Sequence, residues 1–402
     1  MDGPERAGKM KRRQRIWAWA LAAPVTLLIV GIIALVIREH SLGERLIEDV
    51  NRLSGPRPNA PPEIATDGDY LECVRTLPSV PPIYEELDKD VSAAVQSVRH
   101  GAPLASLPSN IRGDLAALEN LAAAVLSCAR SSTTRIDWTS ATHLPPDLKP
   151  SGKRAVTLLL RHQLEQGNTG AALHGCCSVV HWARALTETH GPLGADQGRT
   201  LLLYLLPVCV DAIDRAAADE KRAFVREVTL ARGGYPSFSR VIELDSVISQ
   251  LGLYSRHLSA SQRERLAPGP RAARPWEPDL DWLQRLALRI RWGATVRAND
   301  ARLAAANSPT RDADFLAITK RFSSPLDFLL PLPLEAPGVD TWARYARLHD
   351  GTLAAVDFLL MLARVDLRES GAGDGGWTYV YDDDGNPLTF ELHPDPSPSA
   401  EN

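Results

Sequence analysis

The sequence predicts a mainly α-helical fold: an N-terminal transmembrane helix, then a helical bundle or irregular α-solenoid, and a small C-terminal β-hairpin. Three observations predict it: an uncharged apolar run, helical spacing of apolar residues along most of the chain, and two strand-like runs near its end. The chain has 402 residues, 44% of them hydrophobic, which suffices for a large core. We therefore expect a folded domain behind the apolar run.

The apolar run covers residues 16–37 and contains no charged side chain. A helix needs roughly 20 apolar residues to cross the hydrocarbon layer of a bilayer. The run is longer than the apolar region of a cleaved signal peptide, and no small-x-small cleavage site follows Val36. Residues 16–37 are thus predicted to be an uncleaved, single-pass membrane anchor.

The charges beside this anchor predict its orientation. Segment 1–15 is basic, with six Lys and Arg residues, namely Arg6, Lys9, Lys11, Arg12, Arg13 and Arg15. The comparable stretch after the anchor holds only Arg38, Arg45 and Arg52. By the positive-inside rule, the N-terminus is cytoplasmic and the main domain lies outside. The expected setting is a bacterial inner membrane with a periplasmic domain.

Residues 38–67 are predicted to connect the anchor to the domain without belonging to its core. Ser41 to Leu53 has the pattern of a short amphipathic helix, and four prolines follow within residues 55–62. Closely spaced prolines stiffen a chain into an extended spacer. This stretch is accordingly expected to be a stalk that the domain does not need for folding.

Residues 68–370 are predicted to be the helical domain. Leu115, Leu118, Ala122 and Val125 fall on one helical stripe, and similar stripes recur between Pro and Gly clusters. Many helices of ordinary length joined by short turns are typical of a bundle or a solenoid.

The C-terminal segment 371–392 changes to strand-like patterning. The runs 377–381 and 388–392 are rich in aromatic and β-branched residues, and an Asp-rich turn with Gly and Pro separates them. The turn, with Asp382, Gly385, Pro387 and Phe390 after a helix, resembles the end of type II secretion pseudopilins. The helical body resembles uncharacterised membrane-anchored proteins that carry such a tail. The resemblance of the turn implies a place in a secretion apparatus, whereas that of the body implies no known activity. Residues 393–402, rich in Pro, Ser and acidic residues, are expected to be a disordered tail.

Composition and motifs exclude several classes of function. The net charge is −4 and basic residues cluster only at the N-terminus, which does not fit a nucleic-acid partner. No zincin, P-loop or α/β-hydrolase signature occurs. The sequence therefore offers no standard catalytic motif.

Two groups of residues are candidate metal ligands. On a helix, His174, Cys177 and His181 lie at i, i+3 and i+7, close to one face, and they are donor types that zinc or copper accepts. The turn residues Asp382 and Asp384, with Glu391, match three positions of a calcium-binding loop, although its first position is Val380.

The five cysteines leave at least one thiol unpaired in an oxidising compartment. Helices expected near 169–190 and 196–216 are joined by a turn around Leu193, so they should form an antiparallel hairpin. Cys176 and Cys177 precede that turn by about as many residues as Cys209 follows it. We expect Cys209 to bond Cys177 or, with the helix rotated, Cys176. Cys73 and Cys128 would be the remaining pair.

The sequence thus favours a non-enzymatic membrane-anchored envelope protein with a helical interaction domain and a protein partner that the sequence does not identify. One alternative is a metal-binding or redox enzyme built around His174, Cys177 and His181. The other is a component of a secretion apparatus.

Overall fold

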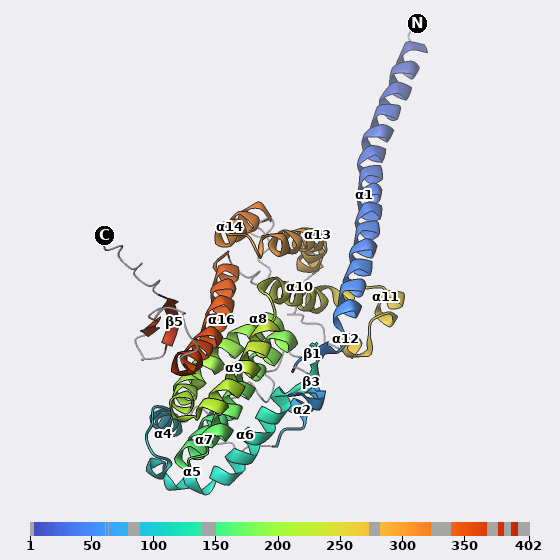
Figure 1. The fold of residues 1–402 in the computed structure, drawn as a ribbon. Helices are drawn as coiled ribbons and strands as arrows, with labels where there is room; N and C mark the ends of the chain where they lie inside the picture. The colour runs from blue at the N-terminus through green and yellow to red at the C-terminus, as the bar shows by residue number, and fades with distance from the viewer. Residues whose placement is uncertain are drawn as a thin grey trace, which may run out of the picture.

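The computed structural model describes residues 4–60, 62, 64–78, 89–138, 150–272, 282–322, 339–367, 377–381 and 387–392. A long N-terminal helix rises from a body made mostly of helices (Figure 1). The mainly α-helical fold predicted from the sequence is confirmed. In chain order the helices are α1 (Pro4–Leu53), α2 (Tyr70–Arg75), α4 (Lys89–Arg99), α5 (Ser109–Gly113), α6 (Leu115–Ala129), α7 (Pro150–Glu165), α8 (Thr169–Arg215), α9 (Ala218–Gly233), α10 (Phe238–Tyr254), α11 (Ala260–Glu264), α12 (Pro268–Ala272), α13 (Trp282–Ala305), α14 (Arg311–Phe322) and α16 (Val339–Leu367).

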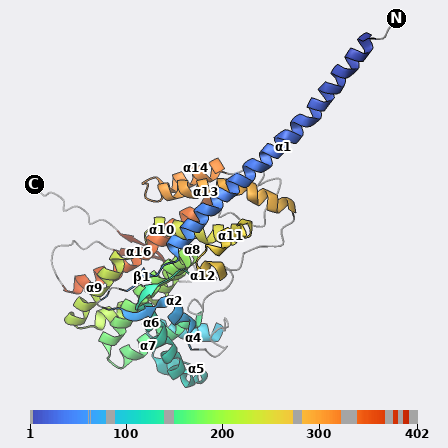
Figure 2. The same ribbon diagram turned by 90° about the vertical axis from the view of Figure 1, so that its right-hand side faces the viewer.

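Helix α1 is a single helix of 50 residues whose middle part and C-terminal end have different surroundings. The aliphatic side chains of its middle part point away from the body; Leu27 is 71% exposed and Ile37 is 65% exposed. By length and composition α1 could cross a membrane, over a window that starts at Val25. The end of the helix enters the body beside α10, α11 and α13 (Figure 2).

The expectation that residues 38–67 form a stalk outside the domain is wrong. Leu46, Ile47, Val50 and Leu53 are each at most 2% exposed. They belong to a core cluster that also contains side chains of α10 and α13. The pattern read as a short amphipathic helix is therefore the buried stripe of α1.

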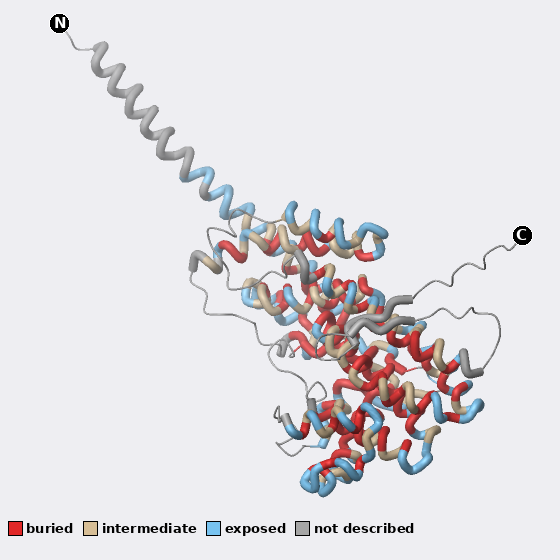
Figure 3. Tube along the Cα trace, turned by 90° about the vertical axis from the view of Figure 1, so that its left-hand side faces the viewer, coloured by how far each residue is buried: buried red, intermediate tan, exposed pale blue. Residues whose placement is uncertain are grey.

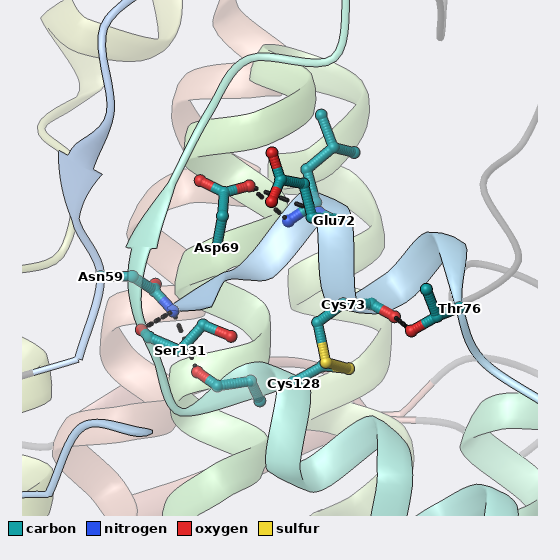
Figure 4. Close-up of a disulfide and its surroundings, with 9 residues drawn as sticks. Asn59, Asp69, Glu72, Cys73, Thr76, Cys128 and Ser131 are labelled. Carbon is teal, nitrogen blue, oxygen red and sulfur yellow. Dashed lines mark hydrogen bonds between the residues drawn. A yellow bond between two sulfur atoms is a disulfide. The ribbon is translucent and has the colours of Figure 1, made fainter. Parts of the chain in front are cut away.

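The proline-rich segment after α1 also belongs to the body, because it supplies an edge strand. Strand β1 (Arg57–Pro58) pairs antiparallel with β3 (Ser131–Thr134), and β2 (Thr66–Asp69) pairs parallel with the other edge of β3. Pro58 is tolerated because β1 is at the edge of the sheet. Asn59, 1% exposed, donates to the carbonyls of Ala129 and Ser131 (Figure 4).

A disulfide attaches α2 to α6 beside this sheet. Asp69 caps α2 by accepting from the backbone amides of Leu71 and Glu72. One turn later Cys73 bonds Cys128, with a Cα–Cα distance of 5.5 Å (Figure 4). The structure thus contains the Cys73–Cys128 pair that was expected from the sequence.

The main core lies where α6, α7, α8, α9 and α16 pack together. Buried residues concentrate along the facing sides of these helices, while their outer turns are exposed (Figure 3). A smaller cluster joins α10, α14 and α16 around Phe238, Phe315 and Trp342. The domain is therefore a multilayer helical bundle.

Helix α8 contains the predicted hairpin, because the chain reverses at Gly191. This residue has φ 59° and ψ −131°, a conformation in which glycine meets the least steric cost. The halves of α8 before and after Gly191 then lie side by side. Cys209 of the second half bonds Cys176 of the first, with Cα atoms 5.6 Å apart.

The pairing of Cys209 with Cys177, expected first from the sequence, is wrong, and the alternative Cys176 is the partner. Gly198 of the second half lies against the backbone of Ala183. Cys176 is seven residues before Ala183, which is two helical turns, so both face the second half. Cys177 is turned by about 100° around the helix axis and remains a buried free thiol.

We expect peptide mapping without reduction to recover Cys177 as the only free thiol of the folded protein. It should react with a thiol reagent only after denaturation, because it is 2% exposed. Replacing Cys176 and Cys209 by alanine should lower the free energy of unfolding by about 3 to 4 kcal/mol, since the bridge closes a loop of 33 residues. Labelling of Cys177 in the native protein would contradict this packing.

We expect Gly194→Ala to disrupt the α8 hairpin. A Cβ atom at this position would lie 1.8 Å from the carbonyl oxygen of Leu186, and backbone cannot move aside as a flexible side chain can. The free energy of unfolding should fall by about 3 kcal/mol or more. Gly233→Ala is the matched control, because a Cβ there meets nothing within 4 Å. Chemical denaturation compares both variants with the unaltered protein, and equal midpoints would contradict the close approach.

The C-terminal hairpin consists of β4 (Trp377–Tyr381) and β5 (Pro387–Leu392), paired antiparallel with Tyr379 opposite Phe390. The predicted hairpin is therefore confirmed. Its Asp-rich turn, and the tail expected at 393–402, lie outside the described residues.

Candidate functional site

Three helices bring a group of polar and ionisable side chains together, from the exposed His174 to the buried His181. Cys177 and His181 of α8 lie around Glu227 of α9, and His174 lies beside Arg130, the C-cap residue of α6. The i, i+3, i+7 spacing on α8 does place its three residues on one side of the helix, as expected. We call these five residues the polar centre.

Arg130 connects His174 and Glu227 within the polar centre. Its Nε donates to Ser178 Oγ at 2.6 Å, and its Nη2 lies 3.0 Å from His174 Nδ1 and donates to the His174 carbonyl oxygen. The same Nη2 forms an ion pair with Glu227. The two side chains are only 8% and 12% exposed. A buried ion pair of this kind is stable only while both partners are present.

The charge of Glu227 depends on its neighbours. Burial alone would raise the pKa of Glu227, but His181 and Arg130 together hold it below the usual value. Glu227 is thus ionised at neutral pH and balances the guanidinium of Arg130.

His181 is buried in the neutral form beside this pair. Its side chain is 0% exposed, and Nε2 lies 3.6 Å from Glu227 Oε1. Within the described part of the chain, neither ring nitrogen has a hydrogen-bond partner. Burial lowers the pKa of His181 below its ordinary value of 6.5. His174 is affected in the same direction, by burial and by the charge of Arg130.

Cys177 completes the polar centre as a neutral thiol. Burial first, and then the negative charge of Glu227, raises the pKa of Cys177 well above its ordinary value. A thiol is a nucleophile or a metal ligand mainly as the thiolate. This environment therefore opposes both roles.

The predicted metal site at His174, Cys177 and His181 does not have the required arrangement. Among the described residues, no group of three or more His, Cys, Asp or Glu side chains is placed to hold a metal ion. The physical reason is Arg130, which contributes the positive charge beside Glu227 and contacts His174 Nδ1, one of the two ring nitrogens through which a metal could bind. The spacing on α8 placed the residues together but could not reveal the cation from α6.

The predicted calcium ligands lie outside the part of the chain whose side chains the structure describes. Asp382 and Asp384 lie outside the described residues, and only the backbone of Glu391, in β5, is described.

A second cationic group joins α4, α7 and α8. The Arg99 guanidinium lies 4.7 Å from the centre of the Tyr204 ring, and the Lys153 ammonium lies 5.2 Å from it. Arg161 donates to the Arg99 carbonyl oxygen and pairs with Asp211. Burial lowers the pKa of both Arg99 and Lys153. These contacts attach α4 to the bundle.

Sequence reasoning missed Arg130, Glu227 and the Arg99 group. Arg130 and Glu227 are separated by 97 residues, and neither lies in a motif. The one available signal was the isolated arginine directly after the apolar helix of residues 115–129, where a basic residue is favoured by the helix dipole.

We expect the polar centre to lower the free energy of unfolding as the pH falls below neutral. The unfolded chain protonates His181 at its ordinary pKa of 6.5, whereas the folded pKa is lower. The contribution of neutral His181 to the free energy of unfolding is therefore complete above pH 6.5. It is lost as the pH falls toward the folded pKa. Denaturation curves at pH 7 and pH 5 should show a larger loss for the unaltered protein than for His181→Gln, by on the order of 1 to 2 kcal/mol. Equal losses would mean that His181 takes up its proton in the folded state.

Comparisons with protein-family models, curated proteins and solved structures gave no match to this chain.

Proposed function

We propose that the protein is a non-enzymatic envelope protein in which α1 anchors a helical interaction domain to the bacterial inner membrane. Its N-terminus is cytoplasmic and its body is periplasmic. The body serves as a scaffold for a protein partner.

The observation that carries this proposal is the division of α1 into an exposed apolar part and a buried part. Val25 to Ile37 presents aliphatic side chains that the body leaves exposed, such as Leu27 and Ile37, whereas Leu46 to Leu53 is core. Exposed aliphatic residues on every side of a helix are unfavourable in water and favourable in lipid. The two disulfides support an oxidising compartment for the body.

The polar centre supports a scaffold more than an enzyme. Arg130, Cys177 and His181 are buried, and only His174 is exposed. The thiol and His181 are held neutral. Catalytic groups need access to substrate and a pKa close to the working pH. The arrangement instead fixes α6, α8 and α9 relative to one another.

The test uses the full-length protein in a bacterium. A reporter active only in the periplasm, fused after Asn402, should be active, and the protein should stay with the membrane after alkaline carbonate extraction. N-terminal sequencing should find residues 1–15 still attached. Release by carbonate, or activity of a reporter that works only in the cytoplasm, would overturn the proposal.

The C-terminal hairpin supports a second candidate, a secretion-apparatus component. The observation in its favour is that β5 follows and contacts α16, the helix-then-hairpin order of the pseudopilin resemblance. Deleting residues 371–402 should then abolish secretion while leaving the body folded by circular dichroism. Unchanged secretion would exclude it.

A further inference from the structure

Helices α13 and α14 form a layer of the body at the place where α1 leaves it. Both lie at the end of the body from which α1 projects (Figure 1), and α13 crosses beside α1 (Figure 2). The Arg38 Nη2 atom donates to the Ile290 carbonyl oxygen at 3.1 Å, and Arg289 Nε donates to Glu39 Oε1 at 2.6 Å. Arg38 directly follows Ile37, the last residue of the apolar run. This part of α13 is therefore level with the end of that run.

A third contact gives the direction of α13. Arg45 of α1 donates to Asp300 of α13 at 2.9 Å. From Arg38 to Arg45, α1 advances about 10 Å, and from Ile290 to Asp300, α13 advances about 15 Å. The two helices thus run in the same sense at an angle. The first turns of α13 consequently point toward the exposed apolar part of α1, in which Leu35 is only partly exposed.

This end of α13 exposes aliphatic side chains. Leu286 is 36% exposed and Ile290 is 40% exposed, and they are four residues apart, so they share one side of the helix. Neighbouring α14 exposes Leu316, at 38%. Elsewhere α13 buries Leu288, Trp292 and Val296 in the core, so it is amphipathic with a second, unburied apolar strip.

The charge of the same layer is positive in a chain whose net charge is −4. Helix α13 carries five arginines and one acidic residue, Asp300, and α14 carries three basic and two acidic residues. An apolar strip bordered by arginine is the pattern of helices that lie in the headgroup region of anionic bilayers.

We infer that the Leu286–Ile290 strip of α13 is a second membrane contact, which inserts into the headgroup region of the bilayer that α1 crosses. The inference depends on the proposed function, because α1 must span that bilayer. With α1 in place, the strip is held at the membrane surface at high effective concentration. The contact holds the body against the lipid in one orientation.

The experiment places a polarity-sensitive fluorophore on single introduced cysteines of the full-length protein in vesicles of phosphatidylethanolamine and phosphatidylglycerol. Leu286→Cys and Ile290→Cys report on the strip. Leu230→Cys is the matched control, because it is 43% exposed on α9, which lies in the bundle away from α1 (Figure 1). Labels at 286 and 290 should emit at shorter wavelength and be quenched several-fold more than the control by lipids with a nitroxide near the headgroup.

Separate readouts distinguish the two proposals. Carbonate extraction of the same vesicles tests the anchor alone. Protein that resists extraction while labels at 286 and 290 behave like the label at 230 would overturn the second contact and leave the anchor intact. Ready disulfide formation between two copies at residue 286 would also overturn it, because the strip would then cover a second copy instead of lipid.

Discussion

A chain that begins at Asp67 should fail to fold, whereas a chain that begins at Arg38 should fold. The shorter chain lacks Leu46, Ile47, Val50 and Leu53, all buried in the core. Each fully buried aliphatic side chain contributes about 1.5 to 3 kcal/mol. The loss is thus about 6 to 12 kcal/mol, which is comparable to the whole stability of a typical domain.

The measurement is cooperative thermal unfolding, followed by circular dichroism, of both chains expressed in an oxidising compartment. The chain that begins at Arg38 is the control. Like the shorter chain it lacks the exposed apolar part of α1, but it keeps the four core residues. A chain from Asp67 that unfolds cooperatively at the same temperature would contradict the role of α1 in the core.

Removing one partner of the buried ion pair should have the second largest effect. Arg130→Met leaves the Glu227 carboxylate buried without its cation and should cost about 3 to 5 kcal/mol. The double variant Arg130→Met with Glu227→Gln should recover much of the loss, because no charge then remains buried. Urea denaturation of both single variants and the double variant measures this coupling.

The pair of Arg222 with Asp219 provides the matched control. It lies on the same helix as Glu227, but its side chains are 57% and 93% exposed. Arg222→Met should cost less than about 1 kcal/mol. A similar loss for Arg222→Met and Arg130→Met would show that burial is not what makes the Arg130 pair important.

The sequence predicted features that depend on local pattern. The apolar run, the helical stripes, the α8 hairpin and the C-terminal hairpin follow from spacing and from turn residues such as Gly191. The small sheet was missed, because strands of two to four residues carry too little alternation to be seen.

Features that depend on contacts between distant residues could not be predicted in the same way. The segment 38–67 was interpreted as a stalk because its prolines suggest an extended chain, and only the fold shows β3 beside it. Cys176 and Cys177 are indistinguishable by distance from the turn. The rotation of the helix decides between them, and Ala183 against Gly198 sets that rotation. The role of Arg130 was likewise invisible without the position of α9.

The continuity of α1 has a mechanical consequence. No break in the helix separates its apolar part from the four core residues at its C-terminal end. The helix and the body should therefore move together as one rigid unit. A tilt of α1 in a bilayer would swing the far end of the bundle, near α5, sideways through a larger distance than the helix itself moves. A change in the thickness or curvature of the membrane would therefore displace any surface at that end of the bundle to which a partner binds.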